Sequence, residues 1–334
     1  MSDQMTVIIP QNVVDDGYNT TDAELLASTV SASSESTWDN GSPPATYSTD
    51  DVVKYQLTSG EDEGIWHTYV SLQNANTSKN PVTETSWWTD QGATNRFKMF
   101  DMFTNTVTSD DTNDITVTLL CHKINTIAFL SVQASEIQIK LYKGTALGDK
   151  TAANTVLDTH TNPLIINLAQ SCADWYGYFF DDYTYTKNIV TQVDLPPYAN
   201  LLVEITFVKL DGYDCECGHC IPGKAFPIGR PRYGIKAGMI DYSKIEEDSI
   251  FGYTYLSQGN YKKTMEVDLI LKSSEVNRVY DVVTGLRAIP CVWQANPDNR
   301  EYEPILVYGF FDDFDLVISD PNWAEVALSI RGMI

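Results

Sequence analysis

Basic residues are scarce in this chain of 334 residues, which has 22 Lys and Arg against 45 Asp and Glu and a formal charge of −23 with neutral histidines. A protein that follows a nucleic-acid backbone needs clustered Lys and Arg to displace the counterions of the phosphates. The sequence contains no such cluster. We therefore expect no nucleic-acid partner, and binding to an anionic membrane surface is disfavoured for the same electrostatic reason.

Long hydrophobic runs are missing as well. Apolar-rich segments such as 124–132 fall well short of the roughly 20 residues that a membrane-spanning helix needs. No basic segment followed by an apolar core opens the chain, so no secretion signal is recognised. These absences predict a soluble protein that does not insert into membranes.

Cysteine is sparse and unevenly placed, with six residues at positions 121, 172, 215, 217, 220 and 291. This pattern does not match the disulfide framework of a small secreted protein, and it favours synthesis in a reducing compartment. Three thiols and one imidazole nevertheless lie close together, and these are ligand types that zinc takes. We expect no resident cofactor and keep zinc at this cluster as an alternative to free thiols or one local disulfide; the candidate ligands are Cys215, Cys217, His219 and Cys220.

Catalytic signatures are also absent. The sequence has neither a Gly-x-Ser-x-Gly nucleophile motif nor a phosphate-binding or dinucleotide-binding loop. Paired acids such as Asp110-Asp111 and Asp312-Asp313 have turn-like surroundings, which predicts solvated loops. We expect that the protein is not an enzyme, and a glycosidase acting through two of these carboxylates is the catalytic alternative.

The pattern of residues predicts a mainly β protein in four segments. Residues 1–35 form an extended arm, and residues 36–94 a small β module rich in polar loops. Residues 95–228 contain five strand candidates bounded by turn residues, which favours a central antiparallel β-sandwich; they are 115–121, 126–132, 137–142, 164–168 and 201–208. Residues 229–334 are expected to form an α+β assembly domain with one helix on a sheet.

Two helices are predicted. Asp22 can cap a brief one over residues 22–27, where Leu25 and Leu26 give a weak apolar face. A longer helix is predicted after Ser273-Ser274, because apolar residues from Val276 to Leu286 recur at steps of three and four. Its apolar face should cover a sheet built from strands near 265–271, 305–311, 314–318 and 325–330.

Aromatic residues are crowded into the small module, as Trp38, Tyr47, Tyr55, Trp66, Tyr69, Trp87 and Trp88. Exposed tryptophan faces stack on sugar rings, while polar neighbours bind the hydroxyls. The alternative is that the rings form the module's own core or an interface with another subunit. We select Trp66, Tyr69, Trp87 and Trp88 as the candidate glycan- or partner-binding residues.

The order of motifs in this module carries a first resemblance. The segments Tyr47-Ser-Thr-Asp-Asp-Val-Val-Lys-Tyr55, Trp66-His-Thr-Tyr-Val-Ser-Leu72, Asn80-Pro81 and Trp87-Trp88 follow one another. In this order they resemble the small chitin-binding modules of bacterial chitinases. The resemblance implies that residues 36–94 form a carbohydrate-binding-module-like segment.

Five further motifs are spread over nearly the whole chain: Thr21-Asp-Ala23, Gly92-Ala-Thr-Asn-Arg-Phe-Lys-Met-Phe-Asp101, Asp174-Trp-Tyr-Gly-Tyr-Phe-Phe180, Tyr233-Gly-Ile-Lys-Ala-Gly-Met-Ile-Asp-Tyr-Ser243 and Val307-Tyr-Gly-Phe-Phe311. Together they resemble a family of tailed-bacteriophage virion proteins. In that family a carbohydrate-binding-like module precedes a β-sandwich and a closing α+β domain. The cysteine cluster departs from the family pattern.

The family resemblance implies a structural virion protein of a phage tail tip or baseplate, made in the host cytoplasm and located in the tail. It would oligomerise around the tail axis as a trimer or hexamer ring, among distal tail, hub and fibre proteins, and present its module outward to a host-surface polysaccharide or a fibre. Phe310-Phe311, Phe314 and Trp323 would then be buried between subunits. A free polysaccharide-binding protein is the alternative.

Overall fold

The computed structural model describes residues 4–15, 22–31, 35–58, 63–167, 184–186, 189–192, 195–247, 253–295 and 303–333. These residues are mainly β-strand with one α-helix, α2 (Val276–Gly285), and the predicted fold class is confirmed. Short 3-10 helices lie at Lys98–Phe100, Leu147–Asp149, Ala152–Asn154, Ser273–Glu275 and Glu303–Ile305. Within the part of the chain described, no helix is long and apolar enough to cross a membrane.

The chain divides into two compact units. Gln11–Pro222 form the first, called here the sandwich unit, and Met1–Pro10 together with Gly223–Ile334 form the second, called the barrel unit. The predicted boundary at residue 228 lies inside the long strand β19 (Cys215–Pro231), which contributes residues to both units. The predicted N-terminal arm contributes β1 (Met5–Pro10) to the barrel unit, and β2 (Val13–Val14) and β3 (Ala23–Ser28) to the sandwich unit.

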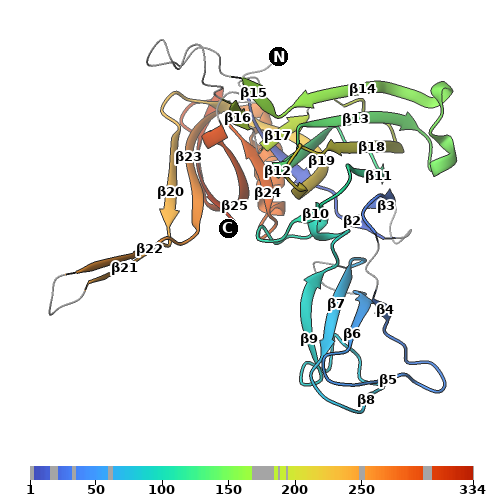
Figure 1. Ribbon diagram of the computed structural model, residues 1–334. Helices are drawn as coiled ribbons and strands as arrows, with labels where there is room; N and C mark the ends of the chain where they lie inside the picture. Colours follow the sequence, from blue (N-terminus) through green and yellow to red (C-terminus); the bar gives the residue numbers. More distant parts are fainter. Residues whose placement is uncertain are drawn as a thin grey trace, which may run out of the picture. The chain divides into compact units, whose positions relative to one another are not determined.

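The barrel unit is a closed ring of six strands (Figure 1). Its order is β19, β1, β24 (Cys291–Gln294), β25 (Leu306–Val317), β26 (Trp323–Gly332) and β23 (Tyr261–Lys272). The ring closes where β23 returns to β19, with Arg230 opposite Ile270 and Pro231 opposite Leu269. Closure pairs both edges of the sheet, so the backbone hydrogen-bonding groups of the ring strands have partners in neighbouring strands.

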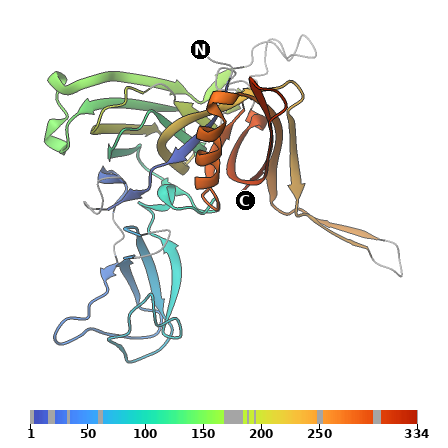
Figure 2. The same ribbon diagram turned by 180° about the vertical axis from the view of Figure 1, so that it is seen from behind.

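Side chains at alternate positions of the strands fill the barrel core. Every second residue of β23 from Met265 to Leu271 is buried, and the same holds for β26 from Ala324 to Ile330. Val279 and Val283 of α2 join this cluster, and Figure 2 shows the helix against the barrel strands. The predicted helix after Ser273-Ser274 is therefore confirmed, because its three- and four-residue spacing gives one apolar stripe that the strands can bury.

One strand prediction in this unit is wrong. Residues 305–311 and 314–318 were expected to be two strands, but β25 runs through both. The strand absorbs the polar Asp312-Asp313 pair as an irregularity in its pairing with β26 between Phe311 and Asp313. This acidic pair therefore lies in a strand and not in a loop. Asp312 also binds Arg331 of β26 at 2.6 Å.

A long hairpin extends the barrel unit. Strand β20 (Lys236–Asp241) pairs with β23 and ends the strand order, and β21 (Lys244–Glu247) pairs with β22 (Thr254–Ser257) between β20 and β23 in the chain. We call the described residues 236–247 and 253–263 the hairpin arm. All six residues of β20 are exposed, so the arm adds little to the barrel core.

The sandwich unit has two layers, as predicted. One sheet has the order β14 (Thr155–Pro163), β13 (Glu136–Lys143), β18 (Leu201–Val208), β11 (Ile115–Cys121), β3 and β2. The other layer contains β17 (Ile189–Gln192), β12 (Thr126–Gln133), the first part of β19 and β10 (Thr108–Asp110). Side chains of both layers share one core, in which the rings of Phe129 and Phe207 meet edge to face at 5.6 Å. A small hairpin of β15 (Ile165–Asn167) and β16 (Thr184–Thr186) follows β14.

The predicted helix over residues 22–27 is wrong, because these residues form most of β3. Ala23 and Leu25 point into the core while Glu24 and Leu26 lie half-buried, which is the two-residue period of a strand. The adjacent edge of β11 pairs with Glu24 to Ser28, with one irregularity between Leu25 and Ala27. Pairing with β11 therefore outweighs the weak helical preference of so short a segment.

The small module lies in the sandwich unit and contains two sheets. Strands β4 (Ser36–Thr37), β6 (Val52–Gln56), β7 (Trp66–Ser71) and β9 (Trp88–Ala93) form the larger sheet, and β5 (Thr46–Tyr47) pairs with β8 (Asn76–Thr77). The motif at 174–180 and Thr21 of the first motif lie outside the described residues.

Candidate functional site

Two of the four aromatic residues proposed to contact a ligand lie in the core of the module. Tyr69 is 3% exposed and Trp88 is 2% exposed, and both pack with Tyr47 and Val53. The Trp88 ring meets the Tyr47 ring edge to face at 5.2 Å, and its Nε1 donates to the Lys79 carbonyl oxygen at 2.8 Å. These two rings therefore do not form a contact face, and the alternative that they form the module's own core applies to them.

The other two aromatic residues are half-buried and have different neighbours. Trp87 lies beside Lys79, whose Nζ is 5.5 Å from the ring centre. Trp66 packs against the core of the sandwich, and the Nζ of Lys54 is 5.8 Å from its ring. The four selected residues thus do not share one face. Trp87 lies in the turn just before β9 and packs at the edge of the core in which Trp88 is buried.

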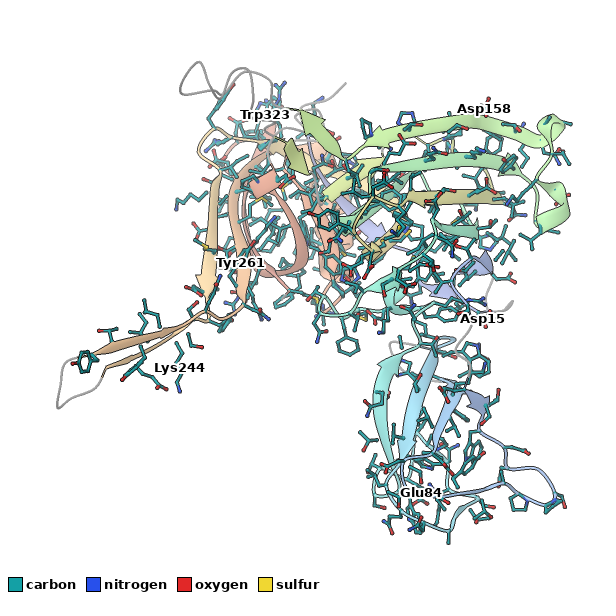
Figure 3. All side chains as sticks on the ribbon, in the orientation of Figure 1. Asp15, Glu84, Asp158, Lys244, Tyr261 and Trp323 are labelled. Carbon is teal, nitrogen blue, oxygen red and sulfur yellow. The ribbon has the colours of Figure 1, made fainter. Side chains whose placement is uncertain are left out.

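Trp66 lines a cavity of about 220 Å³ within the sandwich unit. Its indole Nε1 donates to Oδ2 of Asp15 at 2.6 Å, which holds the ring in place (Asp15 is marked in Figure 3). The other lining residues are Thr37, Lys54, Thr94, Arg96 and Phe97. Asp15 comes from the start of the chain, and the other lining residues come from β4, β6 and β7 and from the segment after β9. The fold therefore brings together distant parts of the sequence.

Sequence reasoning identified Trp66 but missed Asp15, Lys54 and Arg96. No local pattern could have grouped them, because their numbers differ by about 40 in each step. Lys54 and Arg96 lie in two different motifs of the resemblance, and neither motif marks them as binding residues. A weak signal was available in the two cations, since basic residues are few in this chain. This cavity is a candidate binding site in the described part of the molecule.

The cysteine cluster is buried, and zinc at this cluster stays an alternative. Cys215, Cys217 and Cys220 lie in the sandwich core, where burial raises the pKa of the Cys215 thiol to about 11 and the pKa values of the other two further. Burial therefore keeps these thiols protonated when no metal ion is bound. Among the described residues no group of three or more His, Cys, Asp or Glu side chains is placed to hold a metal ion.

The extended strand β19 gives the physical reason. Cys215, Cys217 and His219 are alternate residues on one face of this strand, and a rise of about 3.3 Å per residue spreads them over about 13 Å, whereas four zinc ligands must converge on one point. The local disulfide is also not formed, because Cys215, Cys217 and Cys220 are all free thiols. Cys172 lies outside the described residues.

Buried His219 makes the stability of the protein depend on pH. Burial lowers its pKa to about 4, although a hydrogen bond with the Asp101 backbone acts in the opposite direction. The unfolded chain takes up this proton near pH 6.5, so stability should fall as the pH drops from about 6.5 to about 4, by about 3 kcal/mol in total. Below pH 4 both states are protonated and this contribution stays lost.

We predict that His219→Gln weakens this pH dependence. Urea unfolding of both proteins at pH 7, 5.5 and 4.5 measures it, and the carboxylates common to the two proteins cancel in the difference. The same slope in both proteins over this range would contradict the assignment to His219.

Comparison with protein-family models gives no match, and comparison with curated proteins gives none either.

Proposed function

We propose that this chain is a structural virion protein of a phage tail tip or baseplate. It oligomerises around the tail axis as a trimer or hexamer and presents the module of residues 36–94 to a host glycan or a fibre. Its partners are further copies of itself and other tail proteins such as distal tail, hub and fibre proteins. It is made in the host cytoplasm and resides in the virion. The motif resemblance supports this proposal, and the hairpin arm is the observation that carries it.

The hairpin arm exposes apolar side chains far beyond what a monomer needs. Ile245 of β21 and Leu256 of β22 are direct cross-strand neighbours and are 65% and 77% exposed. The other exposed large apolar residues of the arm are Met239, Ile240, Tyr242, Tyr253, Tyr255 and Tyr261 (Figure 3 marks Tyr261 and Lys244). A concentration of this kind marks a surface that another chain covers. Strand β20 adds an edge at the end of the strand order, which can accept a further strand.

The charge of this segment supports contact between like copies. Residues 236–263 hold four Lys and four Asp or Glu, so their net charge is 4 − 4 = 0, and the remaining residues carry (22 − 4) − (45 − 4) = −23. Two copies of so acidic a chain repel each other over most of their surfaces. The neutral, apolar segment is where they can approach at the lowest electrostatic cost.

The aromatic residues expected at subunit contacts divide into two groups. Phe311 and Phe314 are half-buried and pack against the barrel core, with the Phe311 ring 6.4 Å from that of Trp293. Trp323 is exposed, and Val317 and Ile318 just before it in the chain are exposed too. This second apolar patch supports a subunit contact at Trp323, but Phe311 and Phe314 have partners within their own chain.

The assembly role is tested by changing the cross-strand pair Ile245→Lys and Leu256→Glu together. The opposite charges keep a favourable pair across the hairpin, while the apolar surface is removed. We expect the variant to lose the oligomer seen for the wild-type protein, measured as molar mass by light scattering over a range of concentrations. Its unfolding free energy should stay within about 0.5 kcal/mol of the wild type, because both side chains are exposed.

A matched control changes the neighbouring cross-strand pair, Lys244→Thr with Ser257→Thr, which removes no apolar side chain. This control should assemble like the wild type. A wild-type chain that stays monomeric at all concentrations, or an Ile245/Leu256 variant that still assembles, would contradict the proposal.

A second candidate function, a free polysaccharide-binding protein, is favoured by the cavity beside Trp66. It predicts a monomer with measurable affinity for a soluble glycan. The same mass measurements, combined with a titration against soluble polysaccharide, separate the two functions.

A further inference from the structure

Arg96 is an unusual cation in so acidic a chain. It lines the cavity beside Trp66, and its Nε donates to the Val30 carbonyl oxygen at 3.1 Å. Across the described ranges, no Asp or Glu carboxylate lies within ion-pair distance of its guanidinium. Acids outnumber bases by 45 to 22, and most arginines in such a chain should have an acidic neighbour. Arg232 and Arg331, for example, bind Glu325 and Asp312.

The wall of the cavity holds one further cation and one acid. Lys54 is the second cation, and it has an interaction of its own, whereas Asp15 is the one carboxylate among the lining residues and accepts the Trp66 N–H. Arg96 is therefore the cation of this cavity that is best placed to bind an anion. An anionic group that entered would face the guanidinium fork, which binds carboxylates and phosphates in a bidentate manner.

The remaining lining groups suit a sugar ring. The half-buried indole of Trp66 offers apolar surface, and the exposed Thr37 brings a hydroxyl group. Phe97 and Thr94 are buried behind them and close the cavity. The cavity volume of about 220 Å³ lies below the roughly 300–1,000 Å³ of pockets for drug-sized molecules. It therefore suits a single ring-sized unit of a longer chain.

From this combination we propose that the cavity binds one anionic monosaccharide unit of a polysaccharide, with its carboxylate or phosphate group on Arg96 and Lys54 and its ring against Trp66. The inference rests on the glycan-contact part of the proposed function and adds the chemical class of the sugar. The proposed glycan contact is therefore the cavity, and of the four aromatic residues selected from the sequence only Trp66 lines it.

The test is a titration of the full-length protein, by calorimetry or by NMR, with three probes. A glucuronic acid oligosaccharide supplies a carboxylate, glucose 6-phosphate supplies a phosphate, and a neutral glucose oligosaccharide of matched length supplies neither. We expect at least one anionic probe to bind tenfold or more tightly than the neutral one, and to weaken as salt is added. Which anionic probe binds better distinguishes a uronic acid from a phosphorylated sugar.

Arg96→Gln should lower the affinity for that anionic probe by about tenfold or more, because a charge-assisted pair is lost. The affinity of Arg96→Lys should lie between those of the wild type and Arg96→Gln, since lysine keeps the positive charge but lacks the planar guanidinium that binds an anion in a bidentate manner. Lys54→Gln is a second test that leaves the Val30 contact intact. The matched control is Arg232→Gln in the barrel unit, which removes the same charge and should leave the affinity unchanged.

The proposal is overturned if the neutral probe binds as well as the anionic ones, if no probe binds, or if folded Arg96→Gln and Lys54→Gln both keep the wild-type affinity. Binding of inorganic phosphate as tight as that of both sugars would also overturn it, since only an anion site would then exist. Failure of the cavity is distinct from failure of the assembly role, because the mass measurements on the hairpin variants do not depend on a sugar.

Discussion

Replacing Trp88 with alanine should lower the free energy of unfolding of the small module by about 3–5 kcal/mol, the usual cost of removing a large buried aromatic side chain. The ring is 2% exposed, and its loss leaves a cavity beside Tyr47, Val53 and Tyr69. It also leaves the Lys79 carbonyl without the indole N–H that it accepts at 2.8 Å. The described core of the module contains only four buried side chains, so the loss of one of them removes a large part of its stability.

The comparison with Trp87→Ala makes this prediction specific. Trp87 is half-buried at the edge of this core and has Lys79 beside its ring, so its loss should cost less, about 1 kcal/mol. Thermal unfolding followed by calorimetry measures both variants, with the transition of the barrel unit as an internal reference. Equal losses for the two variants would mean that Trp88 is not the centre of the module's core.

Gly309→Ala should have the second large effect, in the barrel unit. A Cβ atom at Gly309 would lie 2.1 Å from the Arg331 carbonyl oxygen and 2.7 Å from the Gly332 Cα. Gly309 and Gly332 face each other across β25 and β26, so the strands approach closely there. The neighbouring atoms belong to the backbone of a closed ring and cannot rotate away. We expect a loss of about 3 kcal/mol or more, at the upper end of the cost of overpacking.

The matched control is Gly285→Ala at the end of α2. No atom lies within 4 Å of a Cβ at this position, and the substitution restricts the unfolded chain. It should therefore be neutral or stabilise the barrel unit by up to about 1 kcal/mol. Denaturant unfolding of the two variants is the measurement. If Gly309→Ala unfolded at the same denaturant concentration as the wild type, the close approach of β25 and β26 would be refuted.

Much of the fold could be predicted because its signal is local. Residues 201–208 form β18 as predicted, and residues 137–142 lie within β13, since the alternation of apolar and polar residues records which face of the sheet is buried. The helix α2 was found for the same reason, with a period of 3.6 in place of 2. Where the local signal was weak, at residues 22–27, the prediction failed because a neighbouring strand decided the structure.

The candidate site was predicted less well. Composition placed three thiols and an imidazole close together, but β19 spreads them along an extended strand and burial raises the pKa values of the thiols. The crowded aromatic residues drew attention to the small module, but two of the four selected residues, Tyr69 and Trp88, are buried in its core. Which rings are covered depends on the pairing of β6, β7 and β9, and this pairing joins residues as far apart as His67 and Ala93.

The sequence by itself determined the acidic charge, the mainly β character, most strands of the sandwich and the position of the helix. These properties follow from composition and from periods of two and 3.6 residues, which need no knowledge of distant neighbours. The tertiary structure alone decided that six strands close into a barrel, that Tyr69 and Trp88 are buried, and that Asp15, Lys54 and Arg96 meet around Trp66. Each of these depends on contacts between residues far apart in the chain, where backbone pairing and shared burial determine the partners.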